Sequence, residues 1–276
     1  MALSDGRDVD YGGLQGTLYA SVLPATSGEG PGVGGQTARG QAAAGKPVYV
    51  LLHGIGVSHR YLARLHVELA RNADVYTFDL PGFGKASRPK RQLQVEDFAA
   101  FVAGVLAAEG VRTAVVVGHS MGTQVAVELA LQEPDLVAGL VLMGPVVDAA
   151  RKTVTRQALA LTRDALFSES LTSNLIVFGD YFRAGPRWYL TELPVMMEYP
   201  TRDRVAAVRQ PVLVLRGAKD PIAKSPWCAS LAGAARQGTF KEIPGQGHVF
   251  QHTAPDIAAR TISGWVRAVD GFGVTA

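Results

Sequence analysis

The chain has 276 residues, of which 47% are hydrophobic and 18% are charged. This length and composition suit one large domain, or one domain with an inserted subdomain, and exclude a disordered chain. The formal net charge is only +3 and the basic residues are scattered, so the sequence does not indicate a nucleic-acid-binding surface.

Cys228 is the single cysteine of the sequence, which excludes an intrachain disulfide and a cysteine-based metal site. No apolar stretch approaches the ~18 residues that are needed to span a bilayer. The polar N-terminal residues lack the apolar region of a signal peptide. We therefore expect a cytoplasmic protein that does not contact membranes.

In chain order, the sequence begins with a predicted hairpin that includes residues 17–23. After it, short apolar runs alternate with segments of helical length. The pattern predicts strands at 48–52, 75–79, 114–118, 139–143, 212–216 and 239–243, and helices at 60–71, 95–109, 121–132, 225–236 and 255–269. The first five runs lack polar alternation, which is typical of strands buried on both faces of a parallel sheet. We therefore predict an α/β fold with a mostly parallel sheet and helices on both faces.

Two segments break this alternation. Residues 27–46 are dense in Gly, Ala and Gln and have little apolar bulk, which predicts a flexible surface loop. Residues 145–210 are too long for a simple connection and combine helical patterning with large apolar side chains. We interpret 145–210 as a helical cap inserted after the sixth strand, into a core domain formed by 1–144 and 211–276.

The sequence Gly118-His119-Ser120-Met121-Gly122 is a G-x-S-x-G motif between a predicted buried strand and a predicted helix. A tight strand-to-helix turn strains the backbone of its serine and leaves room only for very small residues two positions to either side. Such a turn exposes the hydroxyl of Ser120 near a helix N-terminus, which favours negative charge. We therefore predict that Ser120 is a nucleophile.

An oxyanion hole is predicted beside Ser120. The strand at 48–52 is followed by a glycine-bracketed turn, His53-Gly54-Ile55-Gly56, which can present a backbone amide. The amides of Ile55 and Met121 are the best candidates for the two donors that stabilise a developing oxyanion.

A general base must be one of six histidines. His248 is favoured because it lies in a glycine-rich loop after the last strand, where it can reach the carboxyl edge of the sheet. His252 is the alternative. We expect His119 to point away, because it neighbours Ser120 in sequence, whereas His53, His59 and His66 belong to the oxyanion turn or the first helix.

An acid is required to orient the base. Asp220 follows the strand at 212–216, and it gives the chain order Ser…Asp…His. Asp148, after the strand at 139–143, is the competing candidate. We favour Asp220 because its loop follows the penultimate strand.

Taken together and in this order, these motifs resemble the α/β-hydrolase superfamily over nearly the whole chain. The resemblance implies an eight-stranded, mostly parallel sheet, a helical cap after strand six, and no cofactor or metal. It places Asp220 and His248 at the family's acid and base positions. It also implies that Asp79 and the following Pro-Gly-Phe-Gly loop shape the scaffold rather than do chemistry.

Within this superfamily, Ser120 stands where haloalkane dehalogenases and epoxide hydrolases have Asp, which argues against both. Hydrolases of meta-cleavage products often have Trp after the catalytic histidine. Here Val249 and Phe250 follow His248, which weakens that assignment without removing it.

The favoured function is hydrolysis of a carboxylic ester through an acyl-enzyme, with a small-molecule substrate of apolar or aromatic character. The alternatives are carbon–carbon bond hydrolysis of a diketone-type ring-cleavage product and ligand binding without catalysis. Oligomeric state is left open. The side chains proposed to line the pocket are His119, Trp188, Tyr189, Met196, Met197 and Val249, although packing of the cap onto the core explains most of them equally well.

Overall fold

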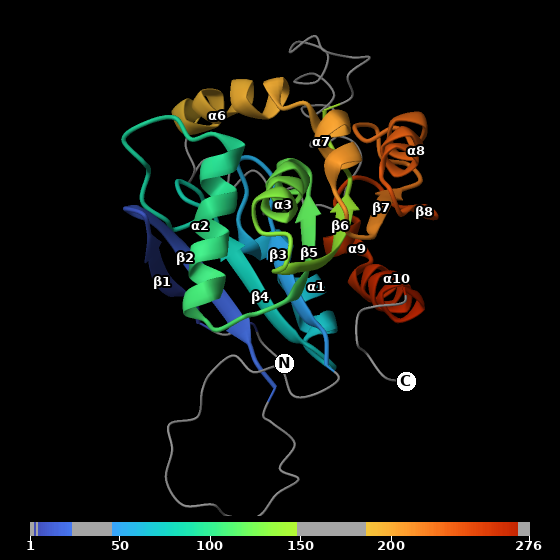
Figure 1. The fold of residues 1–276 in the computed structure, drawn as a ribbon, viewed down its shortest axis with the longest axis horizontal. Coiled ribbons are helices and arrows are strands. Elements are labelled where there is room, and N and C mark those ends of the chain that lie inside the picture. Colours follow the sequence, from blue (N-terminus) through green and yellow to red (C-terminus); the bar gives the residue numbers. More distant parts are fainter. Residues whose placement is uncertain (1–2, 4, 24–45, 148–185, 270–276) are drawn as a thin grey trace, which may run out of the picture.

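The structure is a computed structural model, which describes residues 3, 5–23, 46–147 and 186–269. Within these residues, eight strands form one sheet in the order β1-β2-β4-β3-β5-β6-β7-β8 (Figure 1). The strands are β1 (Arg7–Tyr11), β2 (Leu14–Ser21), β3 (Val48–Leu52), β4 (Asp74–Asp79), β5 (Ala114–His119), β6 (Val137–Met143), β7 (Val212–Gly217) and β8 (Gly238–Ile243). β1 and β2 form an antiparallel hairpin, β2 pairs antiparallel with β4, and β3 to β8 run parallel. The predicted mostly parallel, eight-stranded sheet is confirmed.

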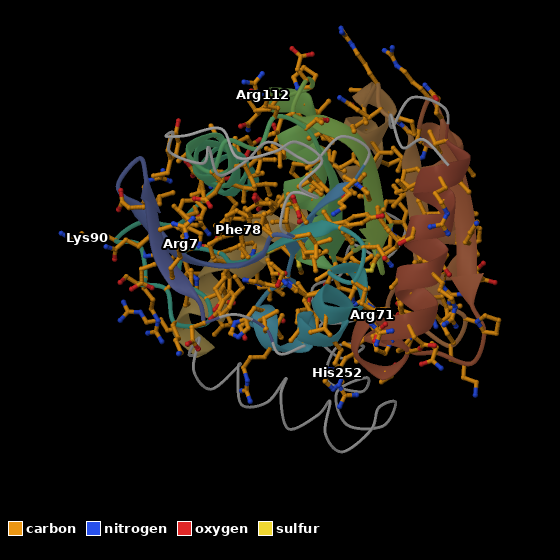
Figure 2. All side chains as sticks on the ribbon, turned by 90° about the horizontal axis from the view of Figure 1, so that it is seen from below. Arg7, Arg71, Phe78, Lys90, Arg112 and His252 are labelled. Carbon is orange, nitrogen blue, oxygen red and sulfur yellow. The ribbon has the colours of Figure 1, made fainter. Side chains whose placement is uncertain are left out.

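Helices cover both faces of the sheet, as predicted. Val48, Val50 and Leu52 of β3 belong to one hydrophobic cluster with α2 (Val95–Ala108), α3 (Met121–Gln132) and α8 (Ser225–Ala234). Tyr49 and Leu51 belong to a second cluster with α1 (Ala63–Leu69) and α10 (Pro255–Ala268). This alternation follows from the two-residue period of a strand. Figure 2 shows Phe78 of β4 in the interior and the charged side chains of Arg112 and Lys90 at the periphery.

The helix predicted at 60–71 is wrong in its bounds. A 3-10 turn, η1 (His59–Tyr61), precedes α1 (Ala63–Leu69), and the amide of Leu62 donates to the carbonyl of His59 at 2.9 Å. Such an i→i+3 bond tightens the turn and separates it from the helix. The short helix α9 (Phe250–Thr253) was also absent from the sequence prediction.

The proposed cap is only partly described. Residues 148–185 and most of the glycine-rich segment 27–46 lie outside the described residues. The described end of 145–210 contains two helices, α6 (Pro186–Glu198) and α7 (Thr201–Ala207). Figure 1 shows α6 at one end of the molecule, beyond α2 and α3. The division into core and cap therefore stays a prediction.

α7 is held on the core by a buried carboxylate. Arg204 donates two hydrogen bonds to Glu128 of α3, from Nη2 to Oε1 at 2.6 Å and from Nε to Oε2 at 3.1 Å. The hydroxyl of Tyr199 donates a third hydrogen bond to Glu128 Oε2 at 2.9 Å.

Among the described helices, none combines the length and the hydropathy that crossing a bilayer requires.

Candidate active site

Ser120 occupies the turn between β5 and α3. Its φ of 54° and ψ of −121° make it the one non-glycine residue with positive φ among the described residues. A Cβ atom on Gly118 would overlap the carbonyl of Gly122, and a Cβ atom on Gly122 would overlap the carbonyl of Leu52. The motif glycines are therefore required by close backbone approach, and the turn holds Ser120 in a strained conformation of the kind that concentrates at functional sites.

Asp220 and His248 are in direct contact. Asp220 follows β7 and His248 follows β8, and His248 Nδ1 lies 2.8 Å from Asp220 Oδ2. A carboxylate only accepts hydrogen bonds, so the Nδ1–H donates and the Nε2 atom of the neutral ring is left as an acceptor. Both side chains are buried.

The other oxygen of Asp220 is held by the backbone. Its Oδ1 accepts from the amides of Ile222 at 2.7 Å and Ala223 at 2.9 Å. Burial by itself would raise the pKa of Asp220, but the charge and hydrogen bond of His248, together with these two amides, hold that pKa below its ordinary value. The carboxyl group is therefore ionised at neutral pH and can stabilise a positive charge on His248 whenever that ring takes a second proton.

The carboxyl ends of the central strands bring these segments together. The amide of Ser120 donates to the carbonyl of Met143 at the end of β6, at 3.0 Å. Gly144 follows β6, and a Cβ atom there would lie 2.9 Å from His248 Cε1 and 3.4 Å from Asp220 Oδ2. Ser120, Asp220 and His248 therefore all follow the carboxyl ends of parallel strands around one glycine.

Arg216, at the end of β7, supports the loop that carries Asp220. It is 4% exposed, and its guanidinium donates to the carbonyl oxygens of Ala223 at 2.6 Å and Asp220 at 3.1 Å. It also pairs with Glu242 of β8. Arginine suits this role because its fork of donors can bind several carbonyls at once. Sequence reasoning missed Arg216, since nothing in the spacing shows that it folds back over its own loop.

The predicted oxyanion turn lies against Ser120. A Cβ atom on Gly54 would lie 3.0 Å from Ser120 Cβ and 3.4 Å from its Oγ. The amide of Gly54 donates to Tyr61 Oη at 2.6 Å. Because the Gly54 amide already donates to Tyr61, the amide of Ile55 remains the candidate oxyanion-hole donor from this turn. Met121 is the first residue of α3, where backbone amides lack a partner within the helix.

His53 fixes the shape of the same turn. The amide of Leu80 donates to His53 Nε2 at 3.0 Å, so the neutral ring carries its proton on Nδ1 and donates to the carbonyl of Gly54 at 2.7 Å. Asp79 is fully buried and accepts from the amide of His59 at 2.6 Å. These contacts are structural, and for Asp79 they agree with the scaffold role that the resemblance implies.

His119 lies beside the proposed base. Its ring centroid lies 4.6 Å from that of His248. Its Nδ1 lies 2.8 Å from Tyr61 Oη, and its Nε2 lies 2.9 Å from the carbonyl of His248. Both ring nitrogens are thus engaged within the protein, so His119 has no ring nitrogen left to bind a substrate. Tyr61 was not identified from the sequence, because only the fold brings its hydroxyl to His119.

The other proposed pocket residues are buried, except Tyr189, which is partly buried. Trp188, Met196 and Met197 of α6 pack in the hydrophobic cluster that includes α2 and α3, and Tyr189 packs against it. Trp188 lies against Phe83, with ring centroids 6.4 Å apart. Val249 belongs to the cluster on the opposite face of the sheet. These contacts favour packing over substrate contact for Trp188 and Val249.

Of the remaining candidates, His66 bonds to Thr77 at 2.7 Å, and burial lowers its pKa to about 4. His252, the alternative base, lies on α9, and within the described residues its ring nitrogens have no hydrogen-bond partner. Asp148, the alternative acid, lies outside the described residues. His252 is not part of the contact between Asp220 and His248.

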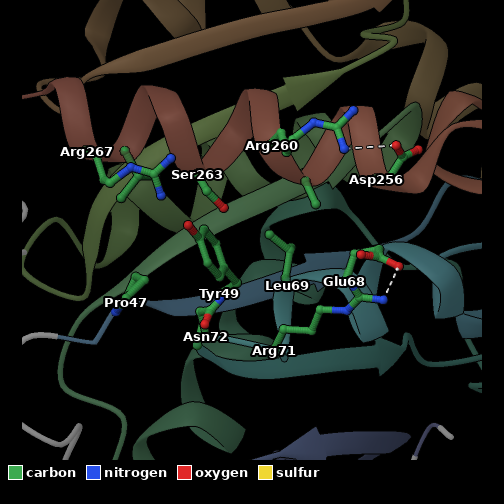
Figure 3. A pocket seen from close by; sticks show the side chains of 13 residues that line it. Pro47, Tyr49, Glu68, Leu69, Arg71, Asn72, Asp256, Arg260, Ser263 and Arg267 are labelled. Atoms are coloured by element: carbon green, nitrogen blue, oxygen red, sulfur yellow. Dashed lines mark ion pairs between the residues drawn. The ribbon is translucent and has the colours of Figure 1, made fainter. Parts of the chain in front are cut away.

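A separate cavity of about 450 Å³ lies between α1 and α10 (Figure 3). Pro47 and Tyr49 line it, so it lies near the amino end of β3, whereas Ser120, Asp220 and His248 follow carboxyl ends. Its rim contains two ion pairs, Arg71–Glu68 at 3.2 Å and Arg260–Asp256 at 3.0 Å. This cavity is therefore distinct from the candidate active site.

Across the described part of the chain, no cluster of three or more His, Cys, Asp or Glu side chains could hold a metal ion.

Comparison with known proteins agrees with this fold. The family model described as "Alpha/beta hydrolase family" matches residues 49–261. The chain is 25% identical over 239 residues to (E)-2-((N-methylformamido)methylene)succinate hydrolase of Acinetobacter baylyi, which covers 80% of this chain and 90% of that protein. It is 28% identical over 229 residues to pimeloyl-[acyl-carrier protein] methyl ester esterase of Chromobacterium violaceum, and this match covers 73% of this chain and 87% of that protein. Its fold is similar to that of a thermophilic esterase from Thermogutta terrifontis, with a TM-score of 0.74 and 21% identity over 96% of this chain and 99% of that one.

Proposed function

Because the chain belongs to the alpha/beta hydrolase family, we propose that it is a serine hydrolase that cleaves carboxylic esters with Ser120, His248 and Asp220. The observation that carries this proposal is the strained turn at Ser120 beside the buried contact between His248 and Asp220. The relative from Chromobacterium violaceum named as a methyl ester esterase supports an ester as the substrate.

In the proposed reaction, Ser120 Oγ attacks the ester carbonyl carbon while its proton passes to Nε2 of His248. The negative charge that develops on the carbonyl oxygen is stabilised by the amides of Ile55 and Met121. The C–O bond then breaks, and the proton on His248 passes to the departing alcohol. Water attacks the acyl-enzyme, again giving its proton to His248, and the carboxylic acid leaves as Ser120 recovers its proton.

The anionic Asp220 makes the proton transfer favourable. It stabilises the imidazolium of His248, and it keeps Nδ1 protonated so that Nε2 faces the proton of Ser120. The strained backbone holds the hydroxyl at the start of α3, where the helix dipole favours developing negative charge.

The test is to treat the protein with a fluorophosphonate probe and with p-nitrophenyl esters of increasing acyl length. Ser120→Ala and His248→Ala should lose both labelling and turnover, whereas Ser87→Ala, which changes an exposed serine, should keep both. An active Ser120→Ala protein would overturn the mechanism.

Two other outcomes separate the alternatives. Labelling of Ser120 with negligible ester turnover would favour carbon–carbon bond hydrolysis by the same groups, to be tested with a dienoate ring-cleavage product. Absence of labelling, together with a saturable thermal shift by a small ligand that is not consumed, would favour a binding protein.

A further inference from the structure

A continuous chain of hydrogen bonds begins at Gly54, which lies next to Ser120. The amide of Gly54 lies 2.6 Å from Tyr61 Oη, which lies 2.8 Å from His119 Nδ1. His119 Nε2 lies 2.9 Å from the carbonyl oxygen of His248. Tyr61, His119 and His248 are each 5% exposed or less. The chain thus joins the oxyanion turn to the loop of the proposed base through η1 and the end of β5.

The direction of every bond in this chain follows from its two ends and from a neutral His119 ring. The Gly54 amide can only donate, so Tyr61 Oη accepts from it and gives its own proton to His119 Nδ1. The carbonyl of His248 can only accept, so His119 Nε2 must carry a proton. His119 is therefore the neutral Nε2–H tautomer, and each donor meets one acceptor.

Two features keep His119 in this state. Burial, together with the nearby His248, lowers the pKa of His119 to about 3. Its ring packs against that of His248, with centroids 4.6 Å apart and planes tilted by 56°. A neutral His119 adds no positive charge beside His248 at the moment when His248 accepts a proton.

We propose that His119 and Tyr61 are positioning residues that hold the Gly54–Ile55 turn and the His248 loop at a fixed separation. The kinetic part of this inference rests on the proposed function, since it concerns the separation of an oxyanion donor from the base. In the transition state this separation matters more than in the bound substrate, because charge develops at both places at once. Loss of the chain should therefore lower kcat more than it raises KM.

Three substitutions break different sets of hydrogen bonds in the chain. Tyr61→Phe removes the hydroxyl and leaves the Gly54 amide without its acceptor. His119→Gln can keep a donor near the His248 carbonyl but loses the acceptor for Tyr61, whereas His119→Asn can keep that acceptor but loses the donor. Each should lower kcat about tenfold, the effect of one hydrogen bond of ~1.4 kcal/mol, and change KM less than about twofold.

Tyr49→Phe is the matched control. Tyr49 is a buried tyrosine of β3 whose hydroxyl bonds to Ser263, near the opposite edge of the sheet. Its loss should lower the melting temperature as much as Tyr61→Phe does, with kcat unchanged. The double variant Tyr61→Phe/His119→Gln should be less impaired than the product of the two single effects, because both break the same bond.

Ring ¹⁵N NMR of His119 tests the chain without using turnover. In the wild-type protein the ring should give the Nε2–H tautomer and should not titrate between about pH 5 and about pH 9, although an unperturbed histidine has its pKa near 6.5. This readout separates failure of the inference from failure of the proposed function. If Ser120 did not react with the fluorophosphonate probe but the His119 spectrum were as expected, the proposed function would fail and the hydrogen-bond chain would still hold. Titration of His119 within that range, an Nδ1–H tautomer, or a Tyr61→Phe variant with wild-type kcat would overturn the inference.

Discussion

His248 Nδ1 lies 2.8 Å from Asp220 Oδ2, and these two residues are buried side by side although 28 positions separate them in the chain. The contact forms because parallel strands β7 and β8 place their carboxyl ends together. It leaves Nε2 of a neutral His248 as a proton acceptor. The chemistry proposed for Ser120 depends on that one protonation pattern.

Asp220→Asn should lower kcat by about 10³-fold or more, because an amide can donate to Nδ1 and thereby stabilise the wrong tautomer of His248. The measurement is hydrolysis of the best p-nitrophenyl ester. Asp203→Asn, which changes an exposed aspartate of α7, serves as the control and should retain activity. Wild-type turnover in Asp220→Asn would show that Asp220 does not orient the base.

Gly118→Ala should lower the free energy of unfolding by about 3 kcal/mol or more, because the new Cβ would overlap the backbone carbonyl of Gly122, which cannot move without opening the turn. Gly264→Ala is the contrasting substitution. Gly264 lies within α10 with nothing within 4 Å of its Cβ position, so alanine should stabilise the helix by about 0.5–1 kcal/mol. Chemical denaturation of both variants gives the comparison, and equal stabilities would contradict the steric argument.

Arg204→Ala should destabilise the protein by about 3 kcal/mol, because it leaves Glu128, which is 2% exposed, as a buried charge without its cation. The hydrogen bonds of Arg204 and Tyr199 offset the effect of burial and hold the pKa of Glu128 below its ordinary value. Without Arg204 the pKa of Glu128 should rise. The difference in free energy of unfolding between the variant and the wild type should therefore become smaller as the pH is lowered and Glu128 takes a proton. Arg202→Ala, an exposed neighbour on α7, should be close to neutral. A deficit that is independent of pH would argue against the ion pair as its source.

Glu192 of α6 should make stability fall as pH rises. Burial raises its pKa from 4.5 to about 7, against the opposing effect of the hydrogen bond from the amide of Leu93. The folded state therefore binds this proton more tightly than the unfolded state. Its stabilising contribution is complete below about pH 4.5 and is lost as the pH rises through about 7.

Glu192→Gln removes this titration while keeping an acceptor for the amide of Leu93. Its melting temperature should exceed that of the wild type at about pH 8, and the difference should narrow toward about pH 5. Thermal unfolding at a series of pH values measures it. A difference that stays constant, or one that widens toward acid, would show that Glu192 is ionised throughout.

Much of the fold follows from local pattern. The unbroken apolar runs predict buried parallel strands, and five of them match β3 to β7 closely. The bounds of α1 were wrong because the tighter turn of η1 depends on a local hydrogen bond from Leu62 that periodicity does not show. The glycines around Ser120 could be interpreted from the sequence because a sharp strand-to-helix turn excludes larger residues whatever surrounds it.

Strand and turn propensities act over a few neighbouring residues, so the residue types at the strand ends could be predicted from the order of amino acids alone. Which of those groups are in contact depends on the packing of distant segments. The hydroxyl of Tyr61 reaches His119, 58 positions away, and the guanidinium of Arg216 closes over the loop of Asp220. Such contacts depend on sheet register and on the packing of loops, and a buried polar group takes whichever partner the fold brings within hydrogen-bond distance.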